Sequence, residues 1–142
     1  MAAKKIKIKN DVVLTSGKRK TAIARAFAKP GKGIITVNKK PIAIYTPEFA
    51  RLRLEEPILI AGDIAKGFDI HVDVRGGGWS AQTEAARLAI AKAIVQLTNS
   101  KELKNKYLDY DRHLLVADTR YKEPRKFGTH SRARAKRQKS YR

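Results

Sequence analysis

The last 24 residues of the chain cannot contribute to a folded core, and this limits what the rest can form. Residues 119–142 read TRYKEPRKFGTHSRARAKRQKSYR and hold ten Lys or Arg against one acid, Glu123. Their apolar residues are few and scattered, and Pro124 and Gly128 interrupt any long helix. Such a segment cannot bury enough surface to offset its ordering entropy, so it orders only against a large polyanion. The folded part therefore lies before residue 119, which leaves room for one domain.

Positive charge is concentrated at the two ends of the chain. The 142 residues carry a net charge of +19. Residues 1–40 have twelve Lys and Arg against one acid, whereas residues 41–118 have ten against eleven. This distribution predicts binding to phosphate backbones, with nucleic acid favoured over a membrane surface. We accordingly expect a basic N-terminal arm at 1–10, a globular domain at 11–118 and an extended basic tail at 119–142.

The composition excludes several kinds of protein. The chain has no cysteine, which removes disulfides, thiolate metal sites and a cysteine nucleophile. No apolar run approaches the roughly 18–20 residues of a membrane span, and the start MAAKKIKIKN lacks the apolar stretch of a signal peptide. We expect a soluble cytoplasmic protein with no membrane partner.

The hydrophobic pattern predicts an α+β domain, a small sheet with helices on one side. Strict alternation predicts strands at 21–29 and 68–75. Shorter strands are predicted at 12–15, before a turn at Ser16-Gly17, and at 33–37 and 114–117. We expect residues 24–37 to form a hairpin.

Three helices are predicted between and after these strands. The first covers 47–56, with Thr46 as its cap and Pro57 as its end. The second covers 81–97, with Ser80 as its cap, and is apolar around most of its circumference, so it should be largely buried. The third covers 101–110 and can be capped by Ser100.

A triple glycine, Gly76-Gly77-Gly78, joins a predicted strand to a predicted helix. At such a junction an anion can meet backbone N–H groups and the positive end of the helix dipole. Three interpretations remain open: a tight structural turn, a site for an RNA phosphate, and a site for a soluble nucleotide. The chain has neither GxxxxGK[ST] nor GxGxxG, the phosphate-binding patterns of nucleotide enzymes.

No group of residues in the sequence has the spacing of a catalytic or metal site. His71, His113 and His130 are far apart in the chain, and no cysteine is available to complete a metal site. Asp69 and Asp73 would lie about 13 Å apart along a strand, too far for a paired acid and base. Ser80 stands in GWSA rather than GxSxG. We therefore expect no enzymatic activity, no metal and no cofactor.

The basic clusters carry the functional signal. Lys18-Arg19-Lys20 and Lys39-Lys40 are predicted to lie in turns, where each contact with a phosphate releases counterions. The tail adds aromatic residues that can stack on unpaired bases: Tyr121, Phe127, His130 and Tyr141.

Three stretches of the chain resemble the S-nine family of small-subunit ribosomal proteins in its archaeal and eukaryotic form. The first is SGKRKTAIARA at 16–26. The second is GGGWSAQ at 76–82, continuing to Ala85, Ala89 and Lys92-Ala93-Ile94. The third is DTRYKEPRKFG at 118–128 with the terminal QKSYR. The three motifs occur in the order of the family and together span residue 15 to the last residue, whereas the family pattern does not fix residues 1–10.

The resemblance implies a fold and a function. The fold is that of the second domain of ribosomal protein S-five: a four-stranded sheet, helices on one face and a left-handed βαβ crossover. The implied partners are small-subunit ribosomal RNA, neighbouring small-subunit proteins and the anticodon stem-loop of peptidyl-site transfer RNA. The alternatives are a general nucleic-acid packing protein and a nucleotide-binding phosphotransferase.

The expected contact residues come from the motifs and the basic clusters together. Those expected to contact ribosomal RNA are Lys18, Arg19, Lys20, Arg25, Lys39, Lys40, Gly76, Gly77, Gly78, Arg120, Arg125, Lys126, Arg132, Arg134, Lys136 and Arg137. Those expected to contact transfer RNA are Lys139, Tyr141 and Arg142.

Overall fold

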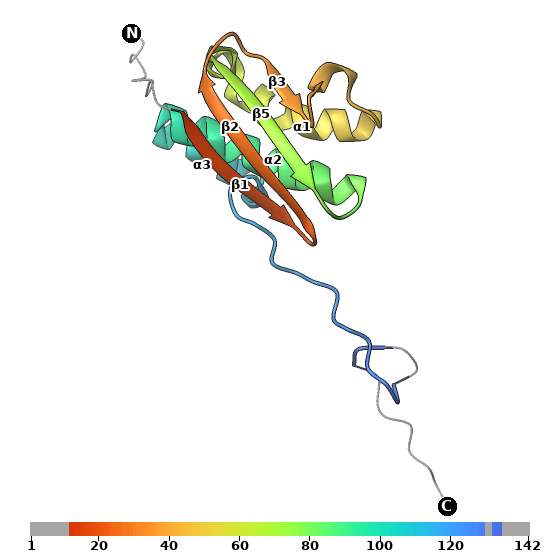
Figure 1. Ribbon diagram of the computed structural model, residues 1–142. Helices are drawn as coiled ribbons and strands as arrows, with labels where there is room; N and C mark the ends of the chain where they lie inside the picture. The colour runs from red at the N-terminus through yellow and green to blue at the C-terminus, as the bar shows by residue number, and fades with distance from the viewer. Residues whose placement is uncertain (1–11, 130–131, 135–142) are drawn as a thin grey trace, which may run out of the picture.

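The computed structural model describes residues 12–129 and 132–134, and it consists of a mixed sheet covered on one face by helices (Figure 1). The sheet has the order β1-β2-β5-β3-β4. Its strands are β1 (Val13–Arg19), β2 (Ala22–Pro30), β3 (Ile35–Val37), β4 (Lys40–Pro41) and β5 (Phe68–Arg75). The predicted arm at 1–10 lies outside the described residues.

Three α-helices and three 3₁₀ turns complete the domain. The helices are α1 (Glu48–Ala61), α2 (Trp79–Thr98) and α3 (Lys101–Tyr110). The 3₁₀ turns are η1 (Ile42–Ile44), η2 (Gly62–Gly67) and η3 (Arg112–Leu114). The α+β class and the one-sided helix layer are confirmed.

The expected four-stranded sheet is wrong, because the described sheet has five strands. The additional strand is the two-residue β4, which pairs antiparallel with β3. Asn38 and Lys39 have φ angles of 49° and 66°, a left-handed geometry that reverses the chain within two residues. A pairing this short has no hydrophobic period of its own, so nothing in the sequence pattern predicts it.

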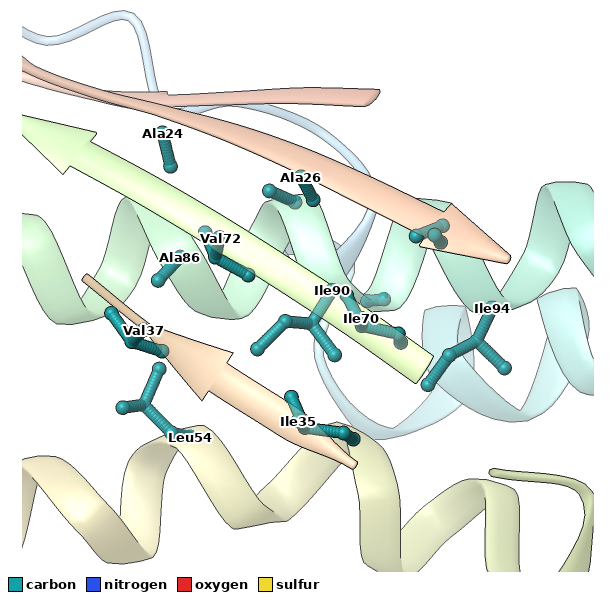
Figure 2. Packing of buried hydrophobic residues seen from close by; sticks show 14 of the residues in the cluster. Ala24, Ala26, Ile35, Val37, Leu54, Ile70, Val72, Ala86, Ile90 and Ile94 are labelled. Carbon is teal, nitrogen blue, oxygen red and sulfur yellow. The ribbon is translucent and has the colours of Figure 1, made fainter. Parts of the chain in front are cut away.

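The core lies between the sheet and α2, and small side chains set its thickness. The four alanines that alternate along β2, at 22, 24, 26 and 28, have no exposed surface. Figure 2 shows Ile70 and Val72 of β5 in the same layer as Ile90 and Ala86 of α2. Because alanine adds so little volume, α2 can pack close to β2 without leaving voids. The predicted burial of the second helix is confirmed.

The predicted hairpin at 24–37 is wrong, because β5 lies between β2 and β3. The turn after β2 forms hydrogen bonds with residues at the start of β5, so it does not form a hairpin with β3. The Gly31 N–H donates to the Gly67 carbonyl at 2.8 Å, and Asp69 Oδ1 accepts from the N–H groups of Lys32 and Ile34 at 2.8 and 3.0 Å. These two bonds lower the pKa of Asp69 because they stabilise its charged form.

Since β3 and β5 are parallel neighbours, the chain between them, which contains α1, is a crossover. The left-handed sense of this crossover stays a prediction.

Two predicted boundaries are wrong because tertiary packing overrides the local signal. Ser16-Gly17 is not a turn, since β1 continues to Arg19. The first helix does not end at Pro57 but continues to Ala61, and Pro57 is buried within it. The Tyr107 hydroxyl from α3 donates to the Pro57 carbonyl at 2.6 Å, which fixes α1 against α3.

The remaining differences concern caps and the last strand. Residues 114–117 form no strand; Leu114 is the last residue of η3 and is buried in the core. The caps of α1 and α2 are Pro47 and Gly78 rather than the predicted hydroxyl residues. The cap of α3 is confirmed, because the Ser100 side chain accepts from the Leu103 N–H at 3.3 Å.

Substituting Gly17 tests the close packing of β1 on α2. A Cβ at Gly17 would lie 2.0 Å from the Ala85 carbonyl oxygen and 3.0 Å from the Ala89 nitrogen. Both atoms are helix backbone and cannot move aside, so Gly17→Ala should lower the free energy of unfolding by about 3 kcal/mol in urea titrations. The control is Gly67→Ala, where a Cβ meets no atom within 4 Å; its effect should stay near 0.5 kcal/mol. Equal effects would contradict this packing.

Candidate nucleic-acid interface

Three basic or glycine-rich segments that are distant in the sequence meet at one end of the sheet. β1 and β5 are each antiparallel to β2, and β3 is parallel to β5, so β1, β5 and β3 run in one direction (Figure 1). The turns that follow these three strands therefore lie at the same end. We call this set of residues the basic end; it consists of Lys18, Lys20, Lys39, Lys40, Arg75 and Gly76–Gly78.

The turns of the basic end are held in defined conformations. Lys20, Asn38 and Lys39 all have positive φ angles, a conformation that non-glycine residues seldom adopt. The Asn38 side chain explains the second turn: its Oδ1 accepts from the Val74 N–H at 2.8 Å and its Nδ2 donates to the Val74 carbonyl at 3.3 Å. This pair of bonds joins the β3–β4 turn to β5. The exposed Lys39 is therefore presented from a fixed backbone.

The triple glycine has a structural role at its first two positions. Gly76 and Gly77 have φ angles of 78° and 67°. A Cβ at Gly76 would lie 2.6 Å from the Thr21 carbonyl oxygen, and one at Gly77 would lie 3.1 Å from the Ala22 Cβ. The interpretation as a tight structural turn is therefore confirmed for this pair. Only glycine permits this approach of the β5–α2 turn to the β1–β2 turn.

Gly78 differs from its neighbours because it borders open space. A Cβ there would meet nothing within 4 Å. It is the N-cap of α2, and the first turn of this helix has neither a side-chain cap nor an acidic residue. The N–H groups of that turn carry the positive end of the helix dipole, which attracts anions. The exposed indole of Trp79 lies beside them.

The outer face of the sheet carries both cations and apolar side chains next to the basic end. Ile23 pairs in register with Lys18 on one side and Arg75 on the other, and Arg25 pairs with Asp73. A depression of about 420 Å³ on this face is lined by Thr21, Ile23, Arg25, Asp73, Arg75 and Gly76. Guanidinium planes beside an aliphatic side chain suit both phosphates and unstacked bases. Arg25 was an expected contact from the sequence and Arg75 was not, although Arg75 is on the polar face of the alternating strand at 68–75.

Arg19 has a different environment from the two lysines beside it in the sequence. Its side chain is only 18% exposed, and its Nε lies 2.6 Å from Glu84 Oε2. Its Nη1 lies 3.1 Å from Asp118 Oδ2. Arg19 was expected to contact RNA, but in the structure it pairs with two carboxylates of the same chain. Lys18 and Lys20 remain exposed.

The tail leaves the head beside this arginine. The Asp118 carboxylate accepts from the Arg120 backbone N–H at 2.9 Å and from its guanidinium at 2.6 Å. The Lys18 ammonium lies 5.3 Å from the centre of the Tyr121 ring, within cation–π range. We call Arg19, Asp118, Arg120 and the Lys18–Tyr121 pair the tail anchor. Hydrogen bonds from Arg120, with the charges of Arg120 and Arg19, hold the pKa of Asp118 far below its usual range.

A second buried arginine joins the helices behind the anchor. The Arg87 side chain is 6% exposed and lies 2.5 Å from Glu56 on α1 and 2.8 Å from Asp111 before η3. Arg87 was not among the residues expected from the sequence to have a role. The available signal is that Arg87 is an arginine among the alanines of a helix expected to be largely buried, and a buried charge requires an ionised partner.

Part of the tail is described beyond the anchor. Residues 119–126 form neither helix nor strand, and the chain turns at Gly128, whose φ is 68°. The tail is not fully extended there, because the Arg134 guanidinium forms an ion pair with Glu123. The expected contact residues Arg125, Lys126 and Arg132 are exposed. The other expected contacts in the tail, Lys136, Arg137, Lys139, Tyr141 and Arg142, lie outside the described residues.

Between 12 and 129 and at 132–134, no three His, Asp or Glu side chains gather as a metal site would require. Within the same part of the chain, no helix combines the length and the apolar character needed to cross a membrane. The exposed His71 ring interacts through Nδ1 with the Thr36 hydroxyl at 2.9 Å.

An α+β domain with lysines, arginines and a glycine turn at one end of its sheet has the character of a nucleic-acid-binding protein. Comparison with known families is more specific. The model of the family described as ribosomal protein S9/S16 matches residues 17–142. The chain belongs to this family, which confirms the resemblance found in its motifs. Members of the family are structural, non-enzymatic ribosomal components, so the expectation that the chain is not an enzyme is confirmed as well.

Three similar proteins come from archaea. The chain is 52% identical over 132 residues to small ribosomal subunit protein uS9 of Methanococcus maripaludis strain C7, covering 92% of the chain and 98% of the relative. It is 54% identical over 130 residues to uS9 of Thermoplasma acidophilum, covering 92% and 100%. It is 49% identical over 131 residues to uS9 of Desulfurococcus amylolyticus, covering 92% and 93%.

The tail anchor predicts a specific pH response. A carboxyl with a lowered folded pKa stabilises the fold above its unfolded pKa, about 3.9, and this contribution is lost as the pH falls through the folded pKa. The amide NMR signals of 119–121 should therefore keep their positions as the pH falls through 3.9 and change only at lower pH. In Asp118→Asn they should already differ at neutral pH, whereas the exposed control Asp109→Asn should leave them unchanged. A wild-type midpoint near 3.9 would contradict the anchor.

Proposed function

We propose that this chain is a structural constituent of the small ribosomal subunit and that its head binds ribosomal RNA through the basic end. Membership in the S9/S16 family supports the first part. The observation that carries the second part is the convergence of three separate basic or glycine segments at one end of the sheet. These segments together form a single charged surface on a fixed backbone, as recognition of a structured phosphate backbone requires.

The residues of the basic end divide by the chemistry they offer. The exposed ammonium groups of Lys18, Lys20, Lys39 and Lys40 suit individual phosphates. The depression with Arg25 and Arg75 can receive a phosphate or an unstacked base. Gly78 leaves the N-terminus of α2 open to a phosphate oxygen, whereas Gly76 and Gly77 contribute by shaping the turn.

The tail extends the same function away from the head. We propose the division into an arm at 1–10, a head at 11–118 and a tail at 119–142, with the tail anchor at the boundary. Along the tail, the expected contacts with ribosomal RNA are Arg120, Arg125, Lys126, Arg132, Arg134, Lys136 and Arg137. Arg19 then acts indirectly, since it holds Asp118 and so sets where the tail begins.

The end of the tail is proposed to contact transfer RNA. The support is the family resemblance of the terminal QKSYR and the attachment of the tail to the basic end. Lys139 and Arg142 supply cations and Tyr141 an aromatic ring, the groups that suit a stem-loop backbone and an unpaired base. Their proposed partner is the anticodon stem-loop of peptidyl-site transfer RNA.

The first test is the salt dependence of RNA binding. The variant Lys20→Ala with Lys39→Ala removes two exposed cations of the basic end without touching the core. Each lost phosphate contact reduces the slope of log affinity against log salt by roughly 0.7–0.9, so the slope should fall by about 1.5. Filter binding to the head domain of small-subunit ribosomal RNA measures it.

The matched control is Lys101→Ala with Lys106→Ala, two exposed lysines on α3. Its net charge equals that of the test variant. If the slope of log affinity against log salt fell equally in both variants, RNA binding would depend only on the total charge of the protein and not on the basic end. Equal affinity of the wild type for duplex DNA would favour the general packing protein instead.

The second test concerns the tail. Ribosomes that carry the protein without residues 139–142 should release peptidyl-site transfer RNA several-fold faster, because two cations and an aromatic ring are lost. Small-subunit assembly, followed by sedimentation, should be unchanged since the head and most of the tail remain. The chain with Lys101→Ala and Lys106→Ala is the control for lost charge. Equal release rates in the truncated and full-length forms would refute the contact.

A further inference from the structure

Helix α1 exposes a row of large apolar side chains that the proposed RNA contacts do not use. Phe49, Leu52 and Leu59 are 59%, 52% and 74% exposed. Their spacing of three and seven residues places them along one side of the helix. The opposite side holds the buried residues Ala50, Leu54, Pro57 and Ala61. We call Phe49, Leu52 and Leu59 the α1 stripe; Ile44, in the adjoining η1, is exposed as well.

The charge around the α1 stripe is opposite in sign to that of the whole protein. Residues 42–67 contain four acids and three bases in a chain of net charge +19. Each of the three bases lies within ion-pair distance of a carboxylate. Arg51 pairs with Glu48 and Glu55, Arg53 with Glu84, and Lys66 with Asp63. This surface therefore offers a phosphate no uncompensated cation. Glu48 and Glu55 share the single cation Arg51, so the surface also carries an excess carboxylate charge that repels a phosphate.

The α1 stripe and the apolar residues on the outer face of the sheet therefore differ in the charges that surround them. On the sheet face, Ile23 stands between Lys18 and Arg75. On α1, Leu52 is near Glu48 and Glu55, which are four residues before and three after it in the helix. RNA suits the first surface and not the second. A second copy of this chain does not suit the α1 stripe either, because a twofold contact would bring its own carboxylates together.

We propose that the α1 stripe binds a basic, amphipathic protein segment, supplied by a neighbouring protein of the small subunit. Apolar side chains of that segment would cover Leu52 and Leu59, and its Lys or Arg residues would meet Glu48 and Glu55, the two carboxylates that share Arg51. This inference rests on the proposed placement in the small subunit. It does not depend on which residues of the basic end bind RNA.

Site-specific photo-crosslinking in assembled small subunits tests the proposal. Leu52 is replaced by p-benzoylphenylalanine in the full-length protein, the subunits are purified and irradiated, and the adduct is identified by mass spectrometry. The expected adduct resists ribonuclease and contains a lysine- or arginine-rich peptide of another small-subunit protein. The same photoreactive residue at Ile23, on the sheet face, is expected to give an RNA adduct.

The outcomes separate this inference from the proposed function. An RNA adduct from position 52, an adduct with a second copy of the chain, or no adduct while position 23 reacts would each overturn the α1 proposal. If position 23 gives no RNA adduct while position 52 reacts with a basic protein, RNA binding by the sheet face fails and the α1 proposal stands.

A substitution provides the quantitative measure. Leu52→Gln with Leu59→Gln removes the apolar contact without changing the charge. Using the crosslinked peptide as a synthetic, labelled probe, we expect its affinity for full-length protein to fall at least tenfold. Leu14→Gln is the control, since Leu14 is 74% exposed, as Leu59 is, but lies on β1. An unchanged affinity in the double variant, or an equal loss in the control, would overturn the proposal.

Discussion

The contact between β1 and α2 at Gly17 is the constraint on which the rest of the domain depends. There is no room for a Cβ between this strand and the Ala85 carbonyl, and the alanines of β2 continue the same thin layer. This close approach brings α2 against the ends of β1 and β2. As a result, Arg19 reaches Glu84 on α2, and the turn that precedes the helix lies against Thr21. The position of the glycine turn within the basic end and the tail anchor both depend on this packing.

Charge in the head is sorted by burial rather than by position in the sequence. The Arg19 and Arg87 side chains are largely removed from solvent and pair with carboxylates, because a lone cation there would carry a large desolvation cost. Lys18 and Lys20, on either side of Arg19, remain exposed. A run of three basic residues therefore does not supply three phosphate contacts. On a strand, alternate side chains point to opposite faces, so the middle residue takes a different role.

Local signals predicted the parts of the fold that local forces determine. The alternating strands at 21–29 and 68–75 and the Ser100 cap are confirmed, because periodicity and capping act within a few residues. Strand order is a different matter. The sequence contains nothing to indicate that β5 enters between β2 and β3, since that position depends on pairings across some forty residues. The same limit applies to the site. The turns at Lys20 and Lys39 could be predicted, whereas Lys18 and Arg19, expected in a turn, belong to β1 and Lys40 belongs to β4. The convergence of the turns and the anchor at Asp118 could not be predicted.

The direction of the strands gives the head two unlike surfaces. Because β1, β5 and β3 run the same way, their basic turns collect at one end of the sheet, and the crossover between β3 and β5 contains α1. That crossover contains four acidic residues, Glu48, Glu55, Glu56 and Asp63. The turns that follow β1, β3 and β5 contain no acidic residue. A protein buried in RNA on every side would gain nothing from an acidic, leucine-bearing helix, since carboxylates repel phosphates. The topology therefore separates the basic end, which we propose binds RNA, from the α1 stripe, which we propose binds protein.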